Sequence, residues 1–476
     1  MSIQDKNCQI PTPEKYVEEM LDYIGYQQNL MGQKVLENSC GEGNILKQIV
    51  KRYIEDAKAH SYSAEDIAIG LERDITAYEI DPKKIELCKR ELNALTDEKG
   101  LPAVDWNIRE EDFLKSESEK YQYIVGNPPY ITYHNLDEED RVFVKETYKT
   151  CKNGRFDYCY AFIEASIHAL ADDGKMIYLI PFSIFRNRFA SHLRILMRDY
   201  VTKIVDYRNQ QVFQGITCST ALMLCEKQNV KENIEYVEST EESSIIVQRS
   251  LLDKKGKKWI FRKNRNEGRR FGDYFQVHNS VATLYNKAFL FEATGIENNT
   301  YISGADRIER EITRPATSTK IQRMQHGDGT EYRIIFPYRV ENGEIIHFDE
   351  TEFGNTYPGA REHLKRYYTN LKKRKADDKA KWFEYGRSQA LAEIGKEKLI
   401  FPMVITRSTQ AYIAGADTVP CAGYFVTVNE ETGLTLQDAK NVLESEAFYQ
   451  YVRDVGTPTT ISSYRVSVHD IVEYRF

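Results

Sequence analysis

The chain has 476 residues, of which 41% are hydrophobic and 29% charged, and its formal net charge at pH 7 is −7. This composition is that of a soluble globular protein, and the length favours two domains over one. The sequence has no run of 18 apolar residues and begins without the apolar core of a signal peptide, so we expect neither membrane insertion nor export and predict a cytoplasmic protein.

The eight cysteines are scattered along the chain without a Cys-x-x-Cys pair. Paired cysteines are typical of zinc ribbons, and regular spacing is typical of disulfide frameworks. The sequence therefore predicts buried or free thiols and no metal.

The first predicted helix begins at Thr12-Pro13, with Thr12 as N-cap and Pro13 at the first helical position, and runs to about residue 29. A short strand over 34–37 then ends at Glu37 and stops in a turn, 38–44, that contains Gly41 and Gly43, after which a helical pattern resumes. A glycine turn after a strand lets the backbone approach a ligand closely. The full dinucleotide pattern G-x-G-x-x-G is absent, so NAD binding is not favoured.

Three more strands are predicted to end in polar residues. The second ends at Glu79 and a helix follows, the third covers 104–109 before Asp112, and the fourth covers 121–126 and delivers Asn127. Ligands in open α/β sheets bind outside the carboxyl ends of parallel strands, and a carboxylate at the second strand suits ribose hydroxyls. Later elements, the helices over 157–172 and up to 199 and the strands over 175–181, 201–207 and 219–226, alternate as in a doubly wound sheet.

The fourth strand runs into Asn127-Pro128-Pro129-Tyr130. An amino group on a planar ring is a poor nucleophile, and acceptors aimed at its two hydrogens would make it more tetrahedral. The side-chain oxygen of Asn127 and the main-chain carbonyl of Pro128 are such acceptors, and Tyr130 offers a ring face for stacking. Asn and Pro also initiate ordinary turns, but the position at a strand end with the other polar strand ends disfavours that simpler interpretation.

After about residue 270 the alternation is lost. Strand-like pieces over 332–338, 344–348 and 399–406 and a basic helix over 361–381 predict a separate α+β domain, so we divide the chain into 1–265 and 266–476. Two runs rich in Lys and Arg, 254–270 and 361–381, are each compatible with a solvated surface. Together they modestly favour a polyanionic partner.

The order of these motifs resembles that of the gamma-class DNA adenine-N6 methyltransferases of bacterial restriction-modification systems. In that family a Thr-Pro segment comes first, followed by the glycine motif, two acidic motifs, Asn-Pro-Pro-Tyr and a target-recognition domain. The resemblance covers most of the first 230 residues. It implies a doubly wound, mostly parallel seven-stranded sheet, S-adenosyl-L-methionine as cofactor, and N6 of a flipped-out adenine in double-stranded DNA as the methylated atom.

By the same resemblance, individual residues acquire roles. Glu37, Gly41 and Gly43 form the glycine motif, in which Asn38 and Glu42 occupy variable positions without an assigned role. Phe213, in Gln211-Val212-Phe213-Gln214, is the candidate for a second aromatic that stacks on the flipped base, although a core aromatic is also compatible with the pattern. The cofactor assignments are Thr12 beside the methionine end, Glu79 at the ribose hydroxyls, Ile80 and Phe113 flanking the adenine, and Asp112 accepting from the adenine amino group.

The second half resembles the target-recognition domain more loosely. Its candidate DNA contacts are Lys372, Lys373, Arg374, Arg387 and Arg407. Arg387 and Arg407, with Gln389 and Gln410, are suited to base edges, although Arg and Gln are also ordinary surface residues. A separate restriction endonuclease is a possible partner.

Two related activities stay open. Protein glutamine methyltransferases use Asn-Pro-Pro-Tyr as well, and RNA base methyltransferases share the problem of a planar nitrogen. The length of the second half and its basic runs disfavour both. The intact tetrapeptide disfavours a noncatalytic DNA-binding subunit, and a fused nuclease is not expected because the Thr12-Pro13 motif begins close to residue 1.

Overall fold

The computed structural model describes residues 11–117, 119–215, 218–228, 232–239, 244–252, 255–262, 267–328, 331–341, 344–429 and 432–476. The chain forms two compact units, Met1–Lys263 with Thr457–Ser462, and Asn264–Gly456 with Ser463–Phe476. The predicted boundary at 265/266 lies outside the described residues. Within the described ranges, no helix is both long and apolar enough to span a membrane.

The first unit is built on one nine-stranded sheet of order β3-β2-β1-β4-β5-β7-β6-β8-β9. Strands β1 to β5 pair in parallel, whereas β7 is antiparallel to β5 and β6. The predicted doubly wound, mostly parallel sheet is confirmed, but it has nine strands and not seven, because β8 and β9 extend it past β6. The strands are β1 Val35–Glu37, β2 Ile75–Glu79, β3 Asn107–Glu110, β4 Tyr121–Gly126, β5 Leu170–Pro181, β6 Val201–Asp206, β7 Thr220–Glu226, β8 Asn233–Glu238 and β9 Ser244–Gln248.

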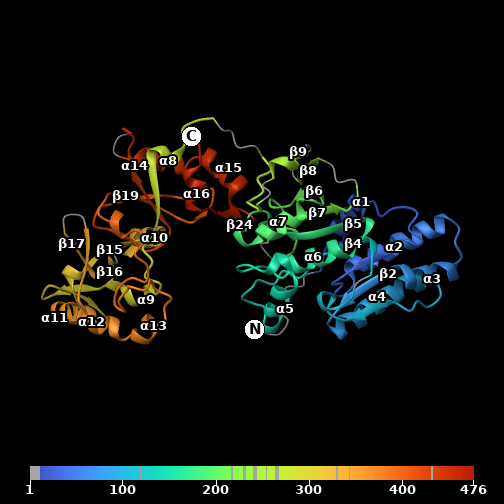
Figure 1. The fold of residues 1–476 in the computed structure, drawn as a ribbon, viewed down its shortest axis with the longest axis horizontal. Coiled ribbons are helices and arrows are strands. Elements are labelled where there is room, and N and C mark those ends of the chain that lie inside the picture. The colour runs from blue at the N-terminus through green and yellow to red at the C-terminus, as the bar shows by residue number, and fades with distance from the viewer. Residues whose placement is uncertain are drawn as a thin grey trace. The chain divides into compact units, whose positions relative to one another are not determined.

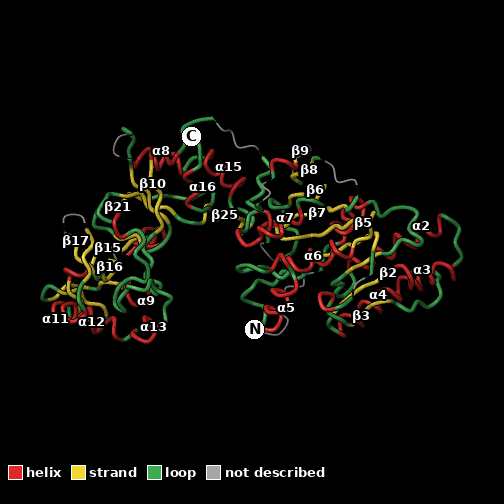
Figure 2. The backbone as a smooth tube through the Cα atoms, in the orientation of Figure 1, coloured by secondary structure: helices red, strands yellow, loops and turns green. Residues whose placement is uncertain are grey.

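Helices cover both faces of this sheet (Figures 1 and 2). Side chains alternate between faces along a strand, so in β5 Ile177 and Leu179 pack into one core while Met176, Tyr178 and Ile180 pack into the other. The first core includes residues of α1 Glu14–Ile24, α2 Asn44–Ala59, α3 Ala64–Asp74 and α4 Pro82–Glu98. The second includes residues of α5 Glu138–Thr147, α6 Cys159–Ala169 and α7 Ser191–Met197.

The first helix differs from its prediction at both ends. Pro13, and not Thr12, is the N-cap residue, and no side chain caps the helix. The helix ends at Ile24 and not near residue 29, because Gly25 adopts a left-handed φ of 78° and its N–H closes the last turn. Thr12 is therefore available for other contacts.

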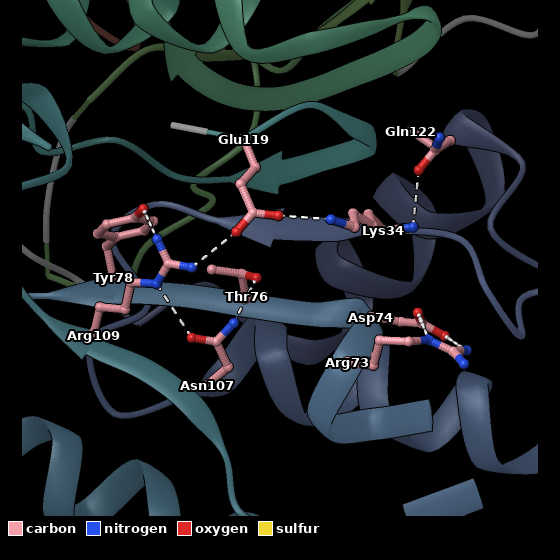
Figure 3. A network of polar contacts seen from close by, with 9 residues as sticks. All are labelled: Lys34, Arg73, Asp74, Thr76, Tyr78, Asn107, Arg109, Glu119 and Gln122. Carbon is pink, nitrogen blue, oxygen red and sulfur yellow. Dashed lines mark hydrogen bonds and ion pairs between the residues drawn. The ribbon is translucent and has the colours of Figure 1, made fainter. Parts of the chain in front are cut away.

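Polar contacts tie the amino ends of the central strands together (Figure 3). Lys34, just before β1, contacts Glu119, just before β4, with 2.6 Å between Nζ and Oε2. Glu119 also lies 3.2 Å from the guanidinium of Arg109 on β3, which donates to the Tyr78 hydroxyl at 2.8 Å. Side chains thus link the residues that precede β1 and β4 to the neighbouring strands β2 and β3.

The second unit mixes helices with short strands in several small sheets, as expected for an α+β domain. One four-stranded sheet has the order β10-β23-β19-β21 and another β11-β16-β15-β22. The predicted basic helix over 361–381 is wrong, since α12 ends at Lys365, α13 ends at Lys372, and an irregular segment follows.

The strands of the C-terminal half are β10 Phe275–Asn279, β11 Leu290–Ala293, β12 Gly295–Glu297, β13 Thr300–Ser303, β14 Asp306–Glu309, β15 Thr313–Thr317, β16 Glu331–Ile335, β17 Tyr338–Glu341, β18 Glu344–His347, β19 Lys398–Phe401, β20 Val404–Ile405, β21 Tyr412–Ala414, β22 Val419–Pro420, β23 Tyr424–Val428, β24 Thr457–Thr460, which belongs to the first unit, and β25 Ser463–Arg465. The helices are α8 Phe271–Tyr274, α9 Asn286–Phe289, α10 Thr319–Asp328, α11 Glu350–Thr356, α12 Pro358–Lys365, α13 Tyr368–Lys372, α14 Leu436–Leu443, α15 Glu446–Val455 and α16 Val468–Val472.

Candidate active site

Two cavities lie at the carboxyl edge of the central strands. The glycine-turn cavity has a volume of about 110 Å³, the Asp112 cavity has a volume of about 290 Å³, and Ser39 lines both. Eight residues that the sequence singled out line these cavities. They are Thr12, Glu37, Gly41 and Asn127 in the glycine-turn cavity, and Glu79, Ile80, Asp112 and Phe113 in the Asp112 cavity.

Glu79, at the end of β2, is held rigidly by main-chain donors. Its carboxylate accepts the N–H of Gly41 at 2.9 Å, of Ile80 at 2.9 Å and of Asp81 at 3.0 Å. A carboxylate has about four acceptor positions, so these three bonds leave about one for a ligand. Glu79 can thus receive one ribose hydroxyl as it stands, and receiving two requires the bond to Gly41 to yield.

Glu37, at the end of β1, is a buried carboxyl group with 2% of its surface exposed. Burial raises the pKa of Glu37 well above its usual range, and the nearby thiol of Cys88 adds to the shift. Its Oε2 atom has no hydrogen-bond partner within the described ranges. A cationic or hydrogen-bonding group of a ligand would therefore be stabilised strongly here.

The two glycines of the turn do different things. Gly41 has a φ of 54°, and a Cβ built there would meet nothing within 4 Å, so this position leaves room for a ligand. Gly43 has a φ of 88°, and a Cβ there would stand 2.5 Å from the Sγ of Cys88 on α4. Gly43 lines neither of the two cavities. Gly43 lines a neighbouring cavity together with Thr12 and Glu42, so its predicted contact with a cofactor stays a prediction. Its lack of a side chain is explained by packing against Cys88.

The Asp112 cavity combines a carboxylate with apolar surface. Asp112 accepts the N–H of Leu114 at 3.0 Å, and burial raises the pKa of its carboxyl group. Phe113 is buried and packs edge-on against Tyr78, with 5.4 Å between ring centroids. Ile80, in contrast, is 59% exposed, as suits an apolar residue that would cover one face of a bound ring.

Asn127 is tied to both the first helix and the glycine turn. Its Nδ2 donates to the Oγ1 of Thr12 at 3.2 Å, and its main-chain carbonyl accepts from the Oγ of Ser39 at 3.3 Å. The first contact links the side-chain amide to the residue before the N-cap of α1, and Asn127 itself lines the glycine-turn cavity. Ser39 had no predicted role, although its position inside the glycine turn was the signal that could have revealed it.

Tyr130 and Phe213, the two predicted stacking residues, lie together. Their ring centroids are 6.5 Å apart with the planes at 73°. Burial raises the pKa of the Tyr130 phenol well above its usual range, so the ring stays neutral. Phe213 is only 2% exposed and packs in the core, which fits the alternative of a core aromatic. Its role on a flipped base stays a prediction.

The predicted DNA contacts in the second unit differ in their side-chain environment. The guanidinium of Arg374 donates to four main-chain carbonyls, those of Thr283, Leu371, Trp382 and Glu384, and burial lowers its pKa. A DNA contact by Arg374 is therefore not supported. Arg387 is paired with Asp377 at 2.6 Å and Arg407 with Glu446 at 2.7 Å. Lys372 and Lys373 are exposed.

No group of metal-ligating side chains occurs within the described ranges. The described cysteines are free thiols, and all but Cys218 are buried. Cys8 lies outside the described residues.

Comparison with known proteins identifies relatives of this chain. Residues 35–213 match the model of the Eco57I restriction-modification methylase family. The Type II restriction enzyme and methyltransferase RM.Eco57I of Escherichia coli is 26% identical over 407 residues, which cover 73% of this chain and 40% of that protein. The Type II methyltransferase M.BstVI of Geobacillus stearothermophilus is 25% identical over 234 residues, which cover 46% of this chain and 42% of that protein.

The fold has a counterpart among solved structures. The Type IIL restriction-modification enzyme MmeI, solved in complex with DNA, superposes with a TM-score of 0.59 at 14% identity, covering 97% of this chain and 64% of that chain. This chain spans about 40% of the length of the curated relatives it matches. The matched segment contains the glycine turn, Glu79, Asp112 and Asn127. The resemblance is thus confirmed at the level of restriction-modification methyltransferases, to which the chain is similar over the segment that matches the Eco57I methylase family.

Proposed function

We propose that this chain transfers a methyl group from S-adenosyl-L-methionine to N6 of a flipped-out adenine in a specific double-stranded DNA sequence. It would act as the modification enzyme of a restriction-modification system, with a separate endonuclease as partner. The observation that carries the proposal is the position of Asn127, which follows β4, contacts Thr12 and borders the glycine-turn cavity. The two curated relatives, both named as methyltransferases, support the reaction class.

The walls of the two cavities fit this cofactor. The unpartnered oxygen of Glu37 suits an ammonium or hydroxyl group, and the space at Gly41 lets a ligand approach the main chain. Asp112 with the exposed Ile80 suits an adenine that has both an amino group and a flat apolar face. When bound, S-adenosyl-L-methionine supplies an electrophilic methyl group on sulfur.

The residues at the end of β4 would activate the acceptor amine. In this proposal Oδ1 of Asn127 and the main-chain carbonyl of Pro128 accept the two hydrogens of the adenine amino group, which localises its lone pair. Thr12 holds the amide in the required orientation through Nδ2. Tyr130 provides a ring face, worth roughly 1–3 kcal/mol when a base stacks on it. Phe213 is the candidate for the second face.

The test is Asn127→Ala with labelled cofactor and unmethylated genomic DNA. We expect the wild type to label the DNA and N6-methyladenine to appear in its hydrolysate. In Asn127→Ala the rate should fall by about 10² or more, as when one preorganised hydrogen-bonding group is removed from an active site. Binding of S-adenosylhomocysteine should be retained, because Asn127 acts on the amine.

Gln122→Ala is the matched control. Gln122 lies on the same strand at its amino end, where its side chain accepts the N–H of Lys34 at 2.9 Å, and this variant should keep full activity. Methylation by Asn127→Ala at the wild-type rate would overturn the proposed role of the tetrapeptide. Label in RNA or in protein, and not in DNA, would favour one of the two related activities.

A further inference from the structure

Asn38 holds a closed set of buried polar contacts directly behind the glycine turn. It follows β1, and 2% of its surface is exposed. Its Nδ2 donates to the Oγ of Ser166 on α6 at 2.8 Å and to the hydroxyl of Tyr178 on β5 at 2.5 Å. The two hydroxyl oxygens are 2.6 Å apart, and both side chains are fully buried. Three polar atoms thus form a triangle inside the protein.

Counting hydrogens determines which way the amide of Asn38 points. Each of the three short contacts needs one hydrogen along it. With Nδ2 in the triangle, the amide supplies two and one hydroxyl supplies the third. With Oδ1 there, only the two hydroxyl hydrogens are available, and one pair of oxygens would meet without a hydrogen. The observed triangle therefore requires Oδ1 to point away from Ser166 and Tyr178.

The amide oxygen of Asn38 then lies beside Gly126, at the carboxyl end of β4. Asn38 lines the Asp112 cavity. Its Oδ1 would lie 3.5 Å from a Cβ built on Gly126, the residue just before Asn127. This oxygen is buried and has no hydrogen-bond partner within the described ranges. A buried acceptor without a donor costs free energy, and a ligand that brings a donor recovers it.

We propose that Asn38 is a further cofactor-binding residue, whose Oδ1 accepts a hydrogen bond from the cofactor. The proposal rests on the proposed function, since it places S-adenosyl-L-methionine in the two cavities. The donor is either the ammonium group of the amino-acid end or a ribose hydroxyl. Glu37 in the glycine-turn cavity is suited to the first group, and Glu79 in the Asp112 cavity is suited to the second. Ser166 and Tyr178 are positioning residues that hold the amide in this orientation. They do not touch the ligand.

The test measures binding of S-adenosylhomocysteine by calorimetry to Asn38→Leu and Asn38→Ala. Leucine keeps the volume of the side chain, and alanine leaves the bond between Ser166 and Tyr178 intact. In both variants we expect the dissociation constant to rise about tenfold or more, as expected for a lost hydrogen bond to a buried group. The matched control is Asn107→Leu, because Asn107 lies on β3 and its amide donates to Thr76 outside the cavities. The control should bind like the wild type.

A second ligand identifies the donor. Methylthioadenosine has the ribose hydroxyls but lacks the amino-acid end. Unchanged affinity for it in Asn38→Ala would assign the ammonium group, and weakened affinity would assign a hydroxyl. Tyr178→Phe should weaken S-adenosylhomocysteine binding less than Asn38→Ala does, because Oδ1 is still present but less firmly held.

The outcomes separate this inference from the proposed function. A wild type that binds neither ligand would refute the cofactor assignment itself. A wild type that binds, together with folded Asn38→Leu and Asn38→Ala variants of unchanged affinity, would overturn the role of Asn38 alone. Thermal melting of the ligand-free variants establishes that they are folded, and if Asn38→Leu is not, Asn38→Ala decides.

Discussion

Burial and main-chain hydrogen bonds give the acidic residues at the carboxyl edge different properties. Glu37 and Asp112 are carboxyl groups whose pKa is raised by burial, whereas Glu79 is surrounded by three main-chain donors. Acidic residues of similar sequence context therefore present different chemistry to a ligand. The first two gain most from a ligand that brings a donor, and the third is already stabilised by the backbone.

Asp157 offers a way to measure the effect of burial on the stability of the fold. It precedes α6, forms a bridge with Thr132 and accepts from the Tyr160 hydroxyl at 3.4 Å. Burial raises the pKa of Asp157 to about 6. In the folded state the carboxyl is therefore protonated more readily than in the unfolded chain. Its contribution to stability is fully present below about pH 4 and is lost as the pH rises through about 6.

Asp157→Asn should remove this pH dependence. The variant keeps an acceptor for Tyr160 and stays neutral, so at pH 8 its free energy of unfolding should exceed that of the wild type by on the order of 2 kcal/mol, with little difference at pH 4. Denaturant unfolding at both pH values measures it. Asp172→Asn is the control, because the Asp172 side chain is 94% exposed. A difference between Asp157→Asn and wild type that is the same at both pH values would contradict the assignment.

At the scale of elements, the turn between β1 and α2 combines two glycines of different purpose. Gly41 leaves open space beside a cavity, while Gly43 lets α2 begin against Cys88 of α4. Both have a left-handed φ, which a side chain tolerates poorly. One substitution should therefore act on ligand binding and the other on folding.

Gly43→Ala should lower the free energy of unfolding by about 2–3 kcal/mol, from the left-handed backbone and the overlap with Cys88. Adding Cys88→Ala should restore part of this loss, because it removes the sulfur that stands 2.5 Å from the new methyl group. Additive effects of the two substitutions in a double-mutant cycle would rule out the packing explanation.

Gly41→Ala should cost only about 1 kcal/mol in stability, since its new methyl group meets no other atom. It should nevertheless weaken S-adenosylhomocysteine binding, because the methyl group would reduce the space beside the cavity. Unfolding curves and calorimetry on the same preparation separate the two effects. Cofactor binding at the wild-type level would show that the ligand does not approach this turn.

At the scale of the whole molecule, a net charge of −7 coexists with exposed lysines in the second unit. Overall acidity does not oppose DNA binding when cations are grouped locally, since affinity depends on the phosphates they neutralise. Lys372 and Lys373 meet this condition better than Arg374, whose guanidinium is bonded to the main chain.

We expect the affinity for duplex DNA to fall as salt is added. In the double variant Lys372→Ala, Lys373→Ala the slope of log affinity against log salt should shrink by about 2, or about 0.9 for each lost phosphate contact. Fluorescence anisotropy over a salt series measures this slope. Lys83→Ala, an exposed lysine on α4 of the first unit, is the control. A slope unchanged in the double variant would exclude these lysines from the DNA contact.

The position of the candidate site follows from local properties of the sequence. Strand periodicity and the polar residues at or just after the ends of β1 to β4 are local properties, and parallel strands bring their carboxyl ends to one edge. Glu37, Glu79, Asp112 and Asn127 could therefore be placed together before any contact was known. Asn-Pro-Pro-Tyr is local as well, so its chemistry could be read directly.

The contacts of other side chains depend on residues that are far apart in the chain. Asn38 meets Ser166 and Tyr178 across 128 and 140 residues of sequence, and Arg374 reaches Thr283 across 91. Gly43 needs its missing side chain because of Cys88, on another helix. Hydrogen bonds and steric overlap act over a few ångströms in space, and sequence spacing carries no information about partners so far apart. For that reason the edge of the sheet could be predicted, whereas the orientation of the Asn38 amide could not.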